Sequence, residues 1–216
     1  MFIGHFGAGL AAKKFAPKTS LGALITATIL IDLLWPLFLL AGLEVVKIAP
    51  SDTAFTPLEF VSYPYSHSLL MVTLWGSLLG GAYYAVTKYR AGAIALFALT
   101  VSHWVLDFTS HRADMPLYPG GSIKVGLGLW HSIPLTIFIE GSIFVAGCWI
   151  YLAVTRARKL SGVVTIWLFY AFLVAGYAAN IAGGPPPSEQ VLAWAGVTMW
   201  IFPLIGYAVD RLREPR

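Results

Sequence analysis

Long apolar stretches, each about 20 residues in length, account for most of this chain. They cover residues 20–43, 67–87, 91–112, 132–154, 161–182 and 190–209. A helix needs about 20 mostly apolar residues to cross the hydrocarbon core of a bilayer. The sequence therefore predicts an all-α, polytopic membrane bundle with six transmembrane helices, forming a single domain over residues 1–216.

The composition agrees with a membrane protein and leaves little room for a soluble domain. Hydrophobic residues make up 58% of the chain and charged residues only 11%, whereas soluble domains carry about 25% charged residues. The net charge of +4 comes from small basic groups beside the apolar stretches, which is usual at the flanks of membrane helices. We therefore expect no nucleic-acid partner.

The basic residues are divided unevenly between the two ends of the predicted helices. If the N-terminal segment is cytoplasmic, eleven of the 14 Lys and Arg residues fall on the cytoplasmic side, and only Lys47, Arg112 and Lys124 fall outside. Positive residues concentrate in cytoplasmic loops. The sequence thus predicts that both termini are cytoplasmic and that loops 44–66 and 113–131 face outward.

Residues 2–12 form a further apolar segment that is too short to cross a bilayer. It lacks the cationic start and the cleavage site of a secretory signal. Its three glycines permit close contact with other helices. We predict a half-helix that enters the bundle from the cytoplasmic side and delivers His5 to the interior. The alternative is a segment that lies flat on the cytoplasmic surface and leaves His5 solvated.

Ionisable side chains occur within the predicted helices, and they share the outer half of the membrane. An Asp at a helix centre costs at least about 2.5 kcal/mol on insertion scales, so such groups persist where they face a cavity, a partner or an ion. A rise of about 1.5 Å per residue places four of them about 20 to 25 Å from the cytoplasmic boundary and three at or just beyond the outer one. These are Asp32, His103, Asp107 and Glu140, and then His67, His111 and His131.

The stretch "SHWVLDFTSH" at 102–111 brings three such residues onto one helical stripe. His103, Asp107 and His111 are spaced four residues apart, so each lies one turn after the last. A His/Asp pair at this spacing can be only a buried hydrogen bond. The matching depth of the other histidines and carboxylates favours a metal site instead. Imidazole and carboxylate without thiolate suit zinc, with manganese and iron as alternatives.

The order of these residues resembles that of the zinc-dependent phospholipase C and single-strand nuclease superfamily. The closer resemblance is to its membrane branch, the membrane-bound metal-dependent hydrolases of bacteria and archaea. It is carried by "YSHSLL" at 65–70 and "HWVLD" at 103–107, and it covers residues 1 to about 135. The resemblance implies a prokaryotic inner-membrane protein whose metal site lies in residues 1–135, with residues 136–216 completing the bundle.

The resemblance also implies one to three zinc ions. The first ion would be held by Asp32, His67, His103 and Asp107, the second by His5 and Asp107, and the third by His111 and His131. Asp107 would then bridge the first two ions, and Asp32 and Asp107 would take part in catalysis.

Two departures from the family pattern stand out. The soluble relatives use the amine of a processed N-terminal tryptophan, which "MFIGH" does not supply. They also use a glutamate four residues after the last histidine, where this chain has Leu135. Glu140 is our candidate to replace that glutamate as a ligand and catalytic group.

Neighbouring metal ions favour hydrolysis of a phosphoester, because they clamp the phosphoryl group and generate hydroxide at neutral pH. A site at this depth is reached most easily by a lipid, so we expect a phospholipid or lipid-linked substrate. Arg112 and Lys124 are candidates for phosphate contact, and Ser68 for positioning the substrate. A non-catalytic metal-binding scaffold and a metal or proton transporter remain alternatives.

Overall fold

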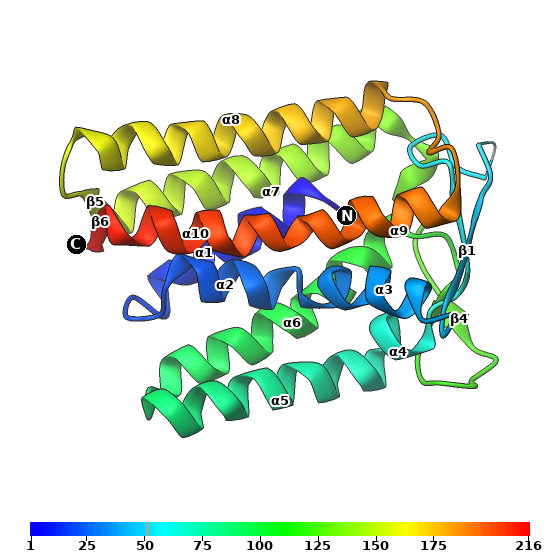
Figure 1. The fold of residues 1–216 in the computed structure, drawn as a ribbon, viewed down its shortest axis with the longest axis horizontal. Helices are drawn as coiled ribbons and strands as arrows, with labels where there is room; N and C mark the ends of the chain where they lie inside the picture. Colours follow the sequence, from blue (N-terminus) through cyan, green and yellow to red (C-terminus); the bar gives the residue numbers. More distant parts are fainter. Residues whose placement is uncertain (51) are drawn as a thin grey trace.

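The protein is a bundle of helices with a few short strands, described by a computed structural model over residues 1–50 and 52–216 (Figure 1). Five of its helical segments are long and apolar enough to cross a membrane. These are α5 (Leu69–Thr87), α6 (Arg90–Ser110), α7 (Ile133–Val154), α8 (Leu160–Ala182), and the nearly continuous pair α9 (Glu189–Val197) and α10 (Ile201–Arg211). The predicted all-α membrane bundle is confirmed.

The sixth predicted span, residues 20–43, is broken rather than continuous. It consists of α2 (Leu21–Thr28) and α3 (Leu30–Leu40), which meet at an angle of 55°. The backbone of Ile29 leaves the helical region, with φ −117° and ψ 17°. Neither Gly nor Pro marks the break, and for that reason the hydropathy pattern did not predict it.

The N-terminal half-helix α1 (Ile3–Ala11) lies inside the bundle and packs mainly on α7, with further contacts to α2 and α6. Gly7 and Gly147 form the crossing point of α1 and α7. A Cβ added to Gly7 would lie 2.5 Å from the carbonyl oxygen of Ile143, and one added to Gly147 would lie 2.1 Å from that of Gly7. Only glycine fits there. The prediction of a buried half-helix is confirmed, and the flat surface alternative is wrong.

Short strands complete the two ends of the bundle. At the end that carries the site, β1 (Val45–Ile48) and β2 (Leu58–Ser62) form a hairpin, and β3 (Met115–Pro116) pairs with β4 (Lys124–Val125). At the opposite end, β5 (Thr155–Ala157) pairs with β6 (Arg213–Pro215). Two short helical turns, α4 (Pro64–His67) and η2 (Leu129–His131), precede α5 and α7.

The β1–β2 hairpin is fastened to the end of α6 by one guanidinium. Arg112 Nη1 lies 2.6 Å from Asp52 Oδ1, Nη2 lies 3.8 Å from Glu59, and Nε donates to Asp114 over 3.2 Å. The hairpin loop also bonds to the turn before α7, because the Phe55 amide donates to the Trp130 carbonyl. The hairpin therefore covers the end of the bundle at which the predicted ligands gather.

Candidate metal centre

Four of the predicted ligands converge from three different elements. Asp32 comes from α3, His67 from α4, and His103 and Asp107 from α6. His67 Nε2 lies 3.5 Å from Asp32 Oδ1 and 3.8 Å from Asp107 Oδ2, and His103 Nε2 lies 3.6 and 3.0 Å from the same two oxygens. Ligand atoms about 2.0 to 2.1 Å from a tetrahedral ion stand about 3.4 Å apart. This cluster can therefore hold a metal ion.

A second group of potential ligands adjoins the group of Asp32, His67 and His103 and shares His103 with it. It consists of His5, His103 and Asp107. His5 Nε2 lies 3.1 Å from Asp107 Oδ1, and the His5 ring stacks on the His103 ring with centroids 3.6 Å apart. The Met1 amine also contacts Oδ1. The two oxygens of Asp107 thus face different partners, Oδ1 toward His5 and Oδ2 toward His67 and His103.

The broken span determines which nitrogen of His103 faces the cluster. In a continuous helix the Thr28 carbonyl would accept from the amide of Asp32, but here it lies 2.7 Å from His103 Nδ1. A carbonyl only accepts, so Nδ1 carries the hydrogen and Nε2 of the neutral ring carries a lone pair. That Nε2 is buried and has no hydrogen-bond partner among the described residues. An orphaned buried nitrogen of this kind fits a metal ligand.

His67 is oriented by a chain of hydrogen bonds that the sequence did not predict. Its Nδ1 lies 2.6 Å from Ser66 Oγ, and that hydroxyl donates to Glu44 Oε2 over 2.7 Å. The hydroxyl therefore accepts from Nδ1–H, which leaves the lone pair on Nε2 for the cluster. Glu44 is buried and accepts two backbone amides as well, from Tyr65 and Ser66. Partners of this type fix metal-binding imidazoles in the correct tautomer.

His111 is held in the same manner, although it belongs to neither ligand group. Its Nδ1 lies 3.0 Å from Asp114 Oδ1, which also accepts the Tyr63 hydroxyl over 2.6 Å. Burial opposes ionisation of Asp114, but the hydrogen bonds from His111, Tyr63 and Arg112 outweigh it and lower the pKa of this carboxyl. The His111 ring packs on Trp130 and lines the same cavity as the cluster.

Two other predicted ligands lie apart from the cluster. His131 is exposed on η2, and neither ligand group in residues 1–50 and 52–216 includes His111, His131 or Glu140. Glu140 instead meets the start of α1, where its Oε2 accepts the amides of Phe2 over 2.8 Å and Gly4 over 3.4 Å. A carboxylate there stabilises the helix N-terminus. Its Oε1 is buried without a hydrogen-bond partner among the described residues.

The three candidates for substrate contact have local partners. Arg112 is surrounded by the carboxylates already described. Lys124 is exposed, with Nζ 3.4 Å from the Val61 carbonyl. Ser68 is buried and caps α5 by accepting the Met71 amide. Within the described part of the chain, none of the three side chains lines the cavity at the cluster.

That cavity has a volume of about 320 Å³. Asp32, His67, Asp107 and His111 form its polar side. Its remaining walls are mostly apolar and aromatic, and they include Trp35, Phe55, Phe60, Trp130, Leu192 and Met199. A largely apolar pocket with a few convergent polar groups is the usual form of a small-molecule site.

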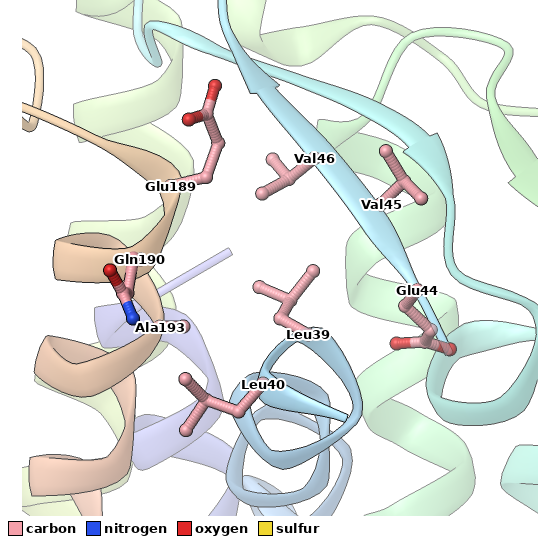
Figure 2. Close-up of a pocket in the computed structure, with 8 residues that line it drawn as sticks. All are labelled: Leu39, Leu40, Glu44, Val45, Val46, Glu189, Gln190 and Ala193. Carbon is pink, nitrogen blue, oxygen red and sulfur yellow. The ribbon is translucent and has the colours of Figure 1, made fainter. Parts of the chain in front are cut away.

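A second pocket of about 340 Å³ lies between α3, β1 and α9 (Figure 2). Figure 2 shows Glu44 and Glu189 on opposite sides of it. Glu189 Oε1 accepts the Ile48 amide over 3.3 Å, whereas the Glu44 carboxylate is bound by Tyr65 and Ser66. Both acids of this pocket are thus engaged in holding the β1–β2 hairpin or the turn before α5.

Comparisons of the chain with protein-family models, with curated proteins and with solved structures gave no match. The geometry of the centre is therefore the basis for assigning a function.

Proposed function

We propose that this protein is a zinc-dependent membrane hydrolase that cleaves a phosphoester in a phospholipid or a lipid-linked substrate. The observation that carries the proposal is the position of the ligand cluster at one side of a mostly apolar cavity. A phosphate group and a hydrocarbon chain on one molecule match those two surfaces.

The residues present fit two neighbouring ions. Asp32, His67, His103 and Asp107 would hold one of them, and His5 with the other oxygen of Asp107 would contribute to the second. The chemistry that zinc would supply when bound there is polarisation of a phosphoryl oxygen and a lowered pKa of coordinated water. Imidazole and carboxylate donors without thiolate suit this metal.

The chain itself orients the ligands and excludes water. The Thr28 carbonyl and the Ser66–Glu44 pair hold two imidazoles with their lone pairs toward the cluster. Trp35, Phe60 and the other aromatic walls limit solvent at the ligands, and a low local dielectric strengthens electrostatic interactions with a bound phosphate. Asp32 is the most open ligand, with 21% of its side chain exposed, so it faces the space that a substrate would occupy.

A transporter fits this arrangement less well than a hydrolase. It needs polar groups along a route to the other side of the membrane. Beyond the cluster, toward the opposite end of the bundle, the interior holds fully buried apolar side chains, among them Leu10, Leu24 and Ile25. A cation leaving the cluster in that direction would meet no ligand from these residues.

The first test is the metal content of purified protein, measured by plasma mass spectrometry, where we expect at least one zinc ion per chain. The protein is then mixed with vesicles that contain phospholipid or polyprenyl phosphate. We expect release of phosphate or a phosphorylated headgroup that stops with a chelator and returns with zinc. Metal-loaded protein that leaves all these lipids intact would contradict the hydrolase, and zinc flux in liposomes would favour a transporter.

A further inference from the structure

The residues lining the cavity differ in exposure according to the element that supplies them. Those from the β1–β2 loop and η2, including Phe55, Thr56 and Trp130, are buried. The exposed lining residues are Gly176 and Asn180 on α8 and Ala195 on α9. The cavity is therefore closed toward the end of the bundle and open between α8 and α9.

This opening extends from near the end of α8, at Asn180, to residues farther inside both spans. Gly176 precedes the end of α8 at Ala182 by about 9 Å, and Ala195 follows the start of α9 at Glu189 by the same distance. The helix α8 and the segment that α9 forms with α10 are each long and apolar enough to span a membrane. The opening between α8 and α9 thus faces the hydrocarbon region of the bilayer, and its two edges lie at the same level.

Small residues keep the opening clear. A Cβ added to Gly176 would meet only the Phe2 ring, at 3.9 Å, which is an ordinary van der Waals contact, so nothing crowds this glycine. Ala195 presents a single methyl group from the facing helix. Phe2 lines the cavity behind them and stacks on Tyr177, with ring centroids 6.3 Å apart.

We propose that the opening between α8 and α9 admits the hydrocarbon chain of a phosphate-bearing membrane lipid directly from the bilayer, with the phosphate at the ligand cluster. The inference rests on the proposed function for the identity of the polar group. It goes further in assigning the route, because a water-soluble phosphoester would have to pass the buried aromatic cover of the hairpin. The proposed ligand is therefore a lipid that diffuses laterally from the bilayer into the protein.

The test uses the full-length protein in vesicles that contain phosphatidylglycerol with a photoreactive diazirine in the acyl chain. After illumination, the modified residues are identified by mass spectrometry. We expect adducts on Trp35 and Phe60, which line the cavity. Adducts confined to the exposed outer residues Phe172 and Val174 would overturn the proposal without any variant being made.

Two variants test the position of the opening. Gly176→Trp should reduce the adducts on Trp35 and Phe60 about tenfold, because the indole ring would clash with an acyl chain that enters through the opening. Gly81→Trp is the matched control, since the space beside this exposed glycine on α5 is open and far from the cavity. If the Gly176→Trp protein does not retain its metal, the variant Ala195→Trp, on the facing helix α9, is used in its place. Unchanged inward adducts in a metal-loaded variant would overturn the proposed route.

The same vesicles separate this inference from the hydrolase. Inward adducts without hydrolysis would leave the route standing and contradict the activity. Hydrolysis with adducts only on the outer residues would support the activity and contradict the proposed route.

Discussion

The broken span α2–α3 and the unbroken span α8 show how differently two apolar stretches of similar length are used. The 23 residues of α8 form one helix, and all its lipid-level carbonyls can be satisfied within it. The span α2–α3 bends by 55° and releases the Thr28 carbonyl, which then holds His103. Pro36 also removes the amide that would bond to the Asp32 carbonyl.

The metal centre thus depends on backbone irregularity as much as on its ligands. A backbone group released at membrane depth needs another partner, because lipid offers none. Here a ligand imidazole is that partner. The regular helix α8 contributes no ligand to either group, and its role at the site is to form one edge of the cavity.

The largest difference between the two regions should appear in metal content. Asp107→Ala removes the carboxylate whose Oδ1 faces His5 and whose Oδ2 faces His67 and His103, so we expect nearly complete loss of bound zinc by plasma mass spectrometry. His111→Ala should retain more metal, because His111 lies outside both groups. Asn180→Ala on α8 is the control and should bind as wild type. Equal stoichiometry in all three would remove the distinction between the regions.

A smaller effect is expected from the orienting residues around the ligands. Glu44→Gln loses one of the acceptors that hold the Ser66 hydroxyl and its backbone amides, so His67 is less well fixed. Changes of this type cost about 10- to 100-fold in metal affinity, measurable by competition with a chelator. Glu189→Gln, across the neighbouring pocket, should leave the affinity unchanged. A comparable loss in both variants would mean that the hairpin, and not the imidazole, had been disturbed.

The close packing of α1 on α7 should contribute to the stability of the protein. Gly7→Ala forces a methyl group against the backbone of α7, and overpacking of this kind costs about 1 to 3 kcal/mol. We expect a lower Tm in detergent and weaker zinc binding, because His5 moves with α1. Gly81→Ala has open space around it and should not lower the Tm. A wild-type Tm for Gly7→Ala would contradict the close α1–α7 crossing.

The last prediction concerns only the orientation of the protein in the membrane, and its variants should change the structure least. In a Cys148→Ser background, Lys124→Cys should react with an impermeant maleimide in intact cells, and Arg158→Cys at the other end should not. Both native side chains are exposed, so access to the reagent depends on the side of the membrane. The reverse labelling pattern would place the centre in the inner leaflet.

The sequence predicted the individual ligands better than their surroundings. Asp32, His103 and Asp107 stood out because each is a costly group at a similar depth, and His67 because it lies at the outer boundary of the same half of the membrane. Glu44 was overlooked, since an acid in an outer loop looks ordinary until the turn of α4 brings Ser66 against it. His131 matched the expected order of ligands, but η2 turns its side chain to the surface.

Hydropathy and helical rise are local properties, so the sequence alone determined the membrane bundle, the half-helix at the N-terminus and the level at which the polar groups lie. The tertiary structure alone decided the break at Ile29, the tautomers of His67 and His103, and the opening between α8 and α9. Each of these depends on which backbone or side-chain groups meet when separate helices cross. The spacing of residues along a single helix does not specify these contacts between helices.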